Sequence, residues 1–209
     1  MATEMTGTRA RRAPNFRVLI GIAIVLTIVR LFIGYLWFSE QGWKAPWAGS
    51  GGFGCDTYKF AASPGQELHG LCDWMQKEAD HPAIGLYGDF VKNLVIPNFG
   101  LFAWSTFFIE GFVTFSLLLG FLTRLGGLLG ALWAVNLLVG LVGVPGESVF
   151  IYLVFMVFSG LFAVIGAKNQ FSVDALLANR YDKMAASGNP LGRLLKLASG
   201  AQVGSAGVL

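Results

Sequence analysis

The chain has 209 residues, of which 55% are hydrophobic and only 13% are charged, and it contains 28 glycines. A soluble domain of this length needs more polar residues to cover its surface, so the composition indicates an integral membrane protein. The net charge of +3 could suggest nucleic acid, but ten of the fifteen basic residues fall in segments that we place in the cytoplasm. We therefore expect the lipid bilayer as a partner and no nucleic acid.

A basic N-terminal segment, residues 1–17, precedes a first apolar run at 18–38 that is long enough to cross a bilayer. The run exceeds the apolar core of a signal peptide and no small-x-small cleavage site follows it, which favours an uncleaved anchor. A long polar segment at 39–98 comes next. Within it, residues 84–95 have apolar side chains at helical spacing and predict an amphipathic helix on the membrane surface, and Pro97 is expected to break the chain after it.

The second half of the chain contains further apolar runs that end at short polar turns. They predict spans at 99–122, 125–143 and 149–167, followed by a tail at 168–209. Gly126, Gly130 and Ala134 recur at four-residue spacing, a pattern typical of closely packed membrane helices. The fold class is thus an all-α bundle of four transmembrane helices.

Orientation follows from the basic residues. The segment at 39–98 holds four lysines beside seven acids, whereas the opposite ends of the spans hold ten Lys and Arg. The positive-inside rule then places both termini in the cytoplasm and the 39–98 loop outside, in the plasma (inner) membrane of a prokaryote.

Both cysteines, Cys55 and Cys72, fall in this external loop. A pair of cysteines that faces an oxidising compartment predicts a disulfide, which would stabilise the loop by roughly 3 kcal/mol. His69 and His81 lack the ligand spacing of a zinc site, and no haem-attachment motif occurs, so we expect no metal or haem.

Charges inside a membrane span are costly and need a reason. Arg30 and Glu110 each lie near the middle of a predicted span, and Asn136 falls at a similar depth in the third. We expect antiparallel helices to bring these three side chains to one layer. That layer could be an Arg–Glu pair that joins helices, with Asn136 satisfying the remaining donors. It could equally be a polar pocket for a quinone head group or a proton relay, with Glu110 and Arg30 as catalytic groups.

Trp37 and Lys44 continue the face of Arg30 towards the outer surface. This stripe of side chains could line an entry route for a quinone, or it could be an ordinary helix contact with interfacial aromatic residues. The candidate quinone-binding set is therefore Arg30, Trp37, Lys44, Glu110 and Asn136.

Short motifs in this order resemble the DoxX/DoxD family. They are RLFIG at 30–34, GWK at 42–44, EG at 110–111, LGFLTR at 119–124 and FSVD at 171–174. The resemblance spans roughly residues 18–177 and matches the family pattern at Arg30, Lys44, Glu110 and Arg124. Members include the small membrane subunit of thiosulfate:quinone oxidoreductase. The external loop is longer than in the minimal family pattern, which suggests a docking surface for another subunit.

The resemblance implies a membrane subunit of a quinone-linked oxidoreductase or electron-transport complex, with quinone as the cofactor. For a DoxD-like member it implies the oxidation of sulfur compounds. Whether the chain is itself enzymatic stays open. The alternative is a non-catalytic structural or assembly subunit of a larger respiratory or photosynthetic membrane complex.

Overall fold

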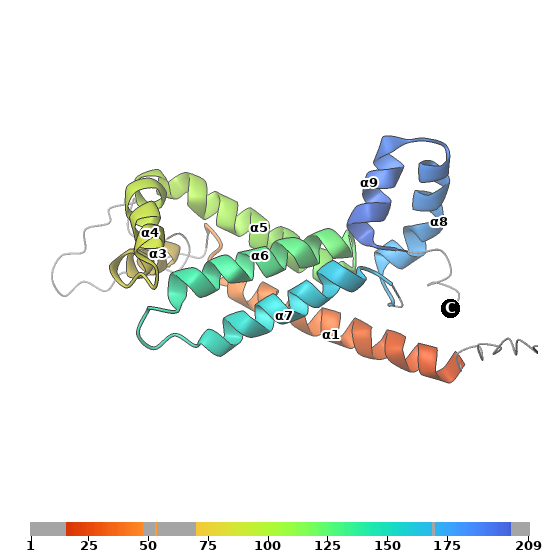
Figure 1. Cartoon of the computed structure of the whole chain (residues 1–209), viewed down its shortest axis with the longest axis horizontal. Helices are drawn as coiled ribbons and strands as arrows, with labels where there is room; N and C mark the ends of the chain where they lie inside the picture. Colours follow the sequence, from red (N-terminus) through yellow and green to blue (C-terminus); the bar gives the residue numbers. More distant parts are fainter. Residues whose placement is uncertain (1–15, 48–52, 54–69, 169, 202–209) are drawn as a thin grey trace, which may run out of the picture.

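The structure is a computed structural model that describes residues 16–47, 53, 70–168 and 170–201. All secondary structure in these residues is helical, as the composition predicted. The bundle consists of α1 (Phe16–Gly42), α5 (Phe99–Leu119), α6 (Thr123–Leu141) and α7 (Val149–Ile165), which run along the long axis of the molecule (Figure 1). Because α1 and α6 each contact both α5 and α7, the four helices close into a ring.

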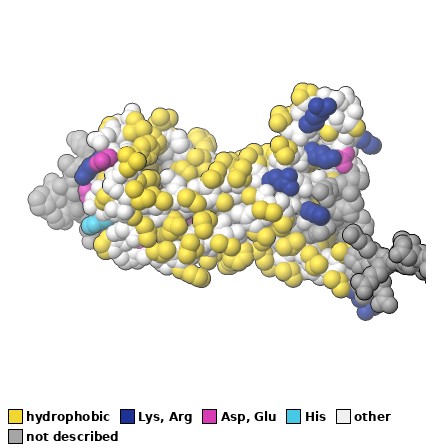
Figure 2. Space-filling model, viewed as in Figure 1, with side chains coloured by type: hydrophobic (Ala, Val, Ile, Leu, Met, Phe, Trp, Pro, Cys, Tyr) yellow, Lys and Arg dark blue, Asp and Glu magenta, His cyan; other side chains and the backbone are white. Residues whose placement is uncertain are grey.

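Three helical stretches in the described residues are long and apolar enough to cross a membrane: α1, the continuous stretch 85–119, and α6. The fourth, α7, is a shorter apolar helix of 17 residues. The exterior of the bundle is largely apolar (Figure 2), and on α1 alone Val18, Val25 and Ile28 are each more than half exposed. A surface of this kind is compatible with a multi-pass membrane protein.

Small residues allow α6 to approach its neighbours closely. Gly126, Gly130 and Ala134, the predicted packing stripe, are all buried. Gly127 lies beside them, and a Cβ added there would stand 2.5 Å from the backbone nitrogen of Ala163 on α7. The helix backbones are therefore almost in contact, as in other membrane bundles that pack through small side chains.

One end of the bundle carries short helices that we call the cap: α3 (Leu71–Asp80), α4 (Gly85–Phe90) and the π-helical turn η1 (Val91–Val95). The expected break at Pro97 is wrong, because the chain stays helical through the 3₁₀ turn η2 (Ile96–Asn98) into α5. Pro97 stands in the first turn of η2, where a missing N–H is tolerated. The chain changes direction between α4 and α5 (Figure 1), a stretch that contains both η1 and η2.

Apolar side chains of α3, η1 and α5 form the core beneath the cap, with Phe53 against Phe99 and Trp104. Cys72 is fully buried in this core. Its predicted partner Cys55 lies outside the described residues, so the disulfide stays a prediction.

The opposite end of the bundle, the tail end, carries the hairpin of α8 (Val173–Ala186) and α9 (Pro190–Ser199). Most of the Lys and Arg side chains visible in Figure 2 gather there. The hairpin is tied to the bundle where the N–H of Ala167 donates to the carbonyl of Ser199 at 2.9 Å. The two ends of the bundle therefore differ in charge as well as in structure.

Candidate functional site

A cavity of about 510 Å³ lies at the cap end of the bundle, between the ends of α1, α5, α6 and α7 and the cap helices. Its size is typical of a small-molecule site. Aromatic side chains form much of the wall, among them Trp37, Trp43, Trp74 and Trp133. The cavity also contains carboxylates and one ammonium group, so its apolar walls surround a small number of polar groups.

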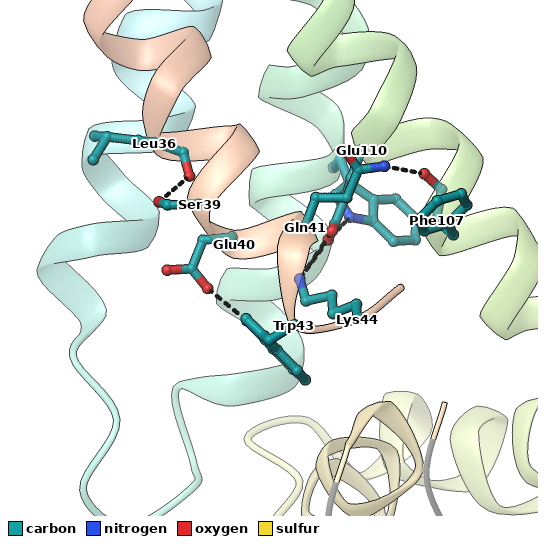
Figure 3. Close-up of polar contacts among 9 residues, drawn as sticks. Leu36, Ser39, Glu40, Gln41, Trp43, Lys44, Phe107 and Glu110 are labelled. Carbon is teal, nitrogen blue, oxygen red and sulfur yellow. Dashed lines mark hydrogen bonds and ion pairs between the residues drawn. The ribbon is translucent and has the colours of Figure 1, made fainter. Parts of the chain in front are cut away.

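The polar centre of the cavity is an ion pair between Lys44 and Glu110 (Figure 3). The Lys44 Nζ donates to both carboxylate oxygens, at 2.8 and 2.9 Å, and the indole N–H of Trp133 donates to Glu110 Oε1 at 3.0 Å. Glu110 is fully buried and Lys44 nearly so. An ammonium group carries three N–H donors, and these two bonds leave one for a bound ligand.

Lys44 reaches this position because the chain turns back into the bundle just after α1 ends at Gly42. The N–H of Lys44 donates to the carbonyl of Gln41 at 3.0 Å. The Gln41 amide in turn donates to the Phe107 carbonyl on α5 at 2.9 Å, as Figure 3 shows. Gly111 makes room for this amide, since a Cβ there would stand 2.6 Å from Gln41 Nε2. Helix α1 is thereby fixed to α5 next to Glu110.

A second polar chain lines the same cavity on the side of the cap. The hydroxyl of Tyr87 lies 3.1 Å from Glu78 Oε2 and 3.3 Å from Asn136 Oδ1. Burial raises the pKa of the Glu78 carboxyl to about 7, although the Tyr87 hydrogen bond and the charge of Lys44 favour its ionised form. Gly140 accommodates this group, because a Cβ there would stand 2.8 Å from the Glu78 carboxyl carbon.

The wall formed by α7 adds a third polar contact. Tyr152 donates its hydroxyl proton to Glu147 at 2.6 Å, and both residues line the cavity. Trp37 closes the wall between α1 and α7. Its indole N–H donates to Ser159 Oγ at 3.1 Å and its ring packs against Phe155, with 4.4 Å between centroids. Trp37 therefore presents an apolar surface to the cavity and not a free donor.

The structure thus brings four of the five predicted quinone-binding residues to one cavity: Trp37, Lys44, Glu110 and Asn136. Arg30 is the exception, and the expected layer with Glu110 does not form. Its guanidinium donates to the carbonyls of Leu117 at 2.5 Å and Phe171 at 2.9 Å. Leu117 is seven residues beyond Glu110, which corresponds to about 10 Å along the helix. Arg30 therefore joins helices near the tail end, while Lys44 pairs with the glutamate.

Asp174 organises the chain next to Arg30. Its carboxylate accepts from the backbone N–H of Leu122 at 3.0 Å and from the N–H and hydroxyl of Thr123 at 2.8 and 2.9 Å. The first N–H groups of α6, which lack partners in the helix, are thus capped by a residue fifty positions away in the sequence. The motif residues at 119–124 and 171–174 therefore serve the structure of the tail end.

Sequence reasoning missed several polar residues of the cavity, namely Glu78, Tyr87, Trp133, Glu147 and Tyr152. For Glu78 a signal existed. Leu71, Cys72, Met75 and Ala79 form the buried face of α3, and Glu78, seven residues after Leu71, belongs to it. A carboxylate on an otherwise apolar helix face indicates burial and a specific partner.

Comparison of the chain with models of known protein families, with curated proteins and with solved structures finds no match. Within the described part of the chain, no group of three or more His, Cys, Asp and Glu could hold a metal ion. The site is a cavity rich in aromatic side chains, with a buried Lys–Glu pair and a separate buried carboxyl group.

Proposed function

We propose that this chain is a membrane subunit of a quinone-linked oxidoreductase and that the cavity at the cap end holds the quinone head group. The observation that carries the proposal is the buried Lys44–Glu110 pair inside a cavity rich in aromatic side chains. The motif resemblance to the DoxX/DoxD family agrees with it and favours a reduced sulfur compound as the electron source. That compound would be oxidised by another subunit docked on the cap.

The proposed topology has four spans, with α7 as the last, both termini in the cytoplasm and the cap outside. At 1.5 Å per residue, the 17 residues of α7 extend about 25 Å, slightly less than a typical hydrocarbon core. Helix α7 packs antiparallel to α6, with its end at Gly127 and its start near Leu141, which supports a path for α7 back through the bilayer. The basic side chains at the tail end agree with a cytoplasmic location (Figure 2).

The chemistry of the cavity suits a quinone. The head group is a flat ring that can pack against tryptophan and phenylalanine side chains. Its carbonyl oxygens need hydrogen-bond donors, and Lys44 has one N–H left after its bonds to Glu110. The ammonium charge would also stabilise the negative charge that develops on a carbonyl oxygen as electrons arrive. Reduction to the quinol takes two electrons from the docked donor and two protons.

Binding can be tested with purified protein in nanodiscs and a short-chain quinone. Four tryptophans line the cavity, so a bound quinone should quench their fluorescence in a saturable manner. Glu110→Gln removes the charge that holds Lys44 and should weaken binding about tenfold or more. Asp80→Asn, a change at an exposed acid on the cap, should leave binding unchanged. Failure of wild-type protein to bind any quinone would refute the proposal.

The complex from native membranes provides a second readout. If the cavity takes part in electron transfer, Glu110→Gln should lower quinone reduction per assembled complex. If the same variant only reduces the amount of assembled complex, while turnover per complex is unchanged, the chain is a structural subunit.

A further inference from the structure

The cavity contains two buried carboxyl groups in different surroundings. Glu110 accepts two hydrogen bonds from an ammonium group and one from an indole N–H. Glu78 has no cation at hydrogen-bond distance among the described residues, and its contact is the neutral hydroxyl of Tyr87. Two carboxyl groups in such different settings can have different tasks, and the one without a cationic partner is the one that can hold a proton.

The geometry around Tyr87 accommodates a protonated Glu78. The hydroxyl lies between two oxygen atoms, Glu78 Oε2 and Asn136 Oδ1, but it has a single hydrogen to donate. With a proton on Glu78, the carboxyl group donates to Tyr87 and Tyr87 donates to Asn136. Both contacts are then hydrogen bonds, and the chain is continuous from the cap to α6.

The charged groups around Glu78 are consistent with this state. Lys44 favours the ionised form, while the carboxylates that line the same cavity, Glu40, Glu110 and Glu147, oppose a further negative charge. Tyr152 is the other titratable group that faces this space from α7. Burial of Glu78 outweighs the attraction of Lys44, and its pKa of about 7 lets it gain and lose a proton near neutral pH.

Glu78 is also placed for exchange with water. It belongs to the cap, and its residue is 9% exposed, whereas Glu110 deeper in the bundle is 0% exposed. On the same helix, Asp80 is exposed and accepts from the Gln76 amide at 3.0 Å, so the outer side of α3 is polar. A proton can therefore reach Glu78 from the cap surface without crossing the bundle.

We propose that Glu78 is the proton-exchanging group of the cavity, which takes a proton from the cap side and delivers it to the bound quinone. This inference rests on the proposed function. When the docked donor has reduced the quinone, the Tyr87 hydroxyl gives its proton to a quinone oxygen and takes the Glu78 proton in its place. The Glu78 O–H bond thereby breaks and an O–H bond forms on the quinone. The Glu78 carboxylate then takes up a proton from water on the cap side. A second round along the same path supplies the second proton of the quinol.

The resting protonation state can be measured without any quinone. Infrared spectra of the full-length protein in nanodiscs, recorded as a function of pH, contain the carbonyl stretch of each protonated carboxyl group. The wild type should show a band that is lost with a midpoint near pH 7. Glu78→Gln should abolish this band, and Asp80→Asn, on the same helix, should retain it. A band that persists in Glu78→Gln, or that is missing from the wild type at pH 5, would overturn the assignment.

Turnover separates this inference from the proposed function. Glu78→Gln and Tyr87→Phe should bind quinone within about twofold of wild type, but should reduce it on the order of 100-fold more slowly. Tyr87→Phe keeps the Glu78 band, so it tests the path even if Glu78→Gln does not fold. Unchanged turnover in both variants would overturn the proton role while leaving quinone binding intact. Absence of quinone binding by the wild type would instead refute the proposed function.

Discussion

The Lys44–Glu110 pair gives the sharpest test of how the bundle is held together. Both charged groups are buried and the two Nζ–O distances are 2.8 and 2.9 Å. Removal of one partner leaves the other charge without compensation in a low-dielectric interior, which costs about 3–5 kcal/mol. Since 1.4 kcal/mol is a factor of ten, Lys44→Met or Glu110→Gln should lower the folding equilibrium constant by a hundredfold to several thousandfold.

The double variant Lys44→Met/Glu110→Gln contains neither charge, and its amide oxygen can still accept from Trp133. We therefore expect it to lose only about 1–2 kcal/mol, less than either single variant. The free energy of unfolding can be measured by denaturant titration in bicelles, followed by tryptophan fluorescence. The pair Lys77–Asp73 on the cap is the matched control, because it is more exposed and should contribute at most about 0.5 kcal/mol. Additive losses in the double variant would refute the reasoning.

Three further predictions concern stability. Asp174→Asn should lower the free energy of unfolding by about 1–3 kcal/mol, because the cap of α6 loses its charge, whereas Asp182→Asn at a more exposed pair should change it by less than about 1 kcal/mol. Gly120→Ala should destabilise the bundle by more than about 1 kcal/mol, since φ is +67° and the added Cβ would clash with Ser172 and Arg30. The control Gly21→Ala, in open space on α1, should stabilise the bundle by up to about 1 kcal/mol. The raised pKa of Glu78 means that this carboxyl group holds a proton more tightly in the folded state than in the unfolded chain. The free energy of unfolding should therefore fall by up to about 3 kcal/mol as pH rises from about 4.5 to 7. Glu78→Gln should flatten this pH dependence. Denaturant titrations at pH 5 and pH 8 check the last prediction. A change in the free energy of unfolding between these two pH values that is as large in Glu78→Gln as in the wild type, or larger, would contradict it.

The sequence was most informative where a single physical rule acts over many residues. Apolar runs predicted helices at the positions of α1, α5, α6 and α7, and the spacing of Gly126 and Gly130 predicted a packing face that is indeed buried. The expected break at Pro97 failed because one proline in a first helical turn costs little.

The site was harder to predict because it depends on contacts between distant residues. Counting residues from the ends of predicted spans put Arg30 and Glu110 at the same depth, but their actual levels on the bundle differ by about two turns. Lys44 was predicted to lie at the outer end of the stripe that begins at Arg30, but no local pattern shows that the chain after Gly42 turns inward and brings Lys44 to Glu110. Similarly, Glu78 belongs to a short polar helix whose burial depends on how the cap packs against α6.

The central claim, that the cavity at the cap end binds a quinone head group, can be tested most directly by photolabelling. A photoreactive azidoquinone is irradiated with the full-length protein in nanodiscs, and the labelled peptides are identified by mass spectrometry. We predict labels on residues around Trp43, Trp74 and Trp133, which line the cavity from three different segments, and loss of these labels when excess unlabelled quinone is added. Labels that fall only on the lipid-facing side chains of the bundle, unaffected by the competitor, would contradict the claim.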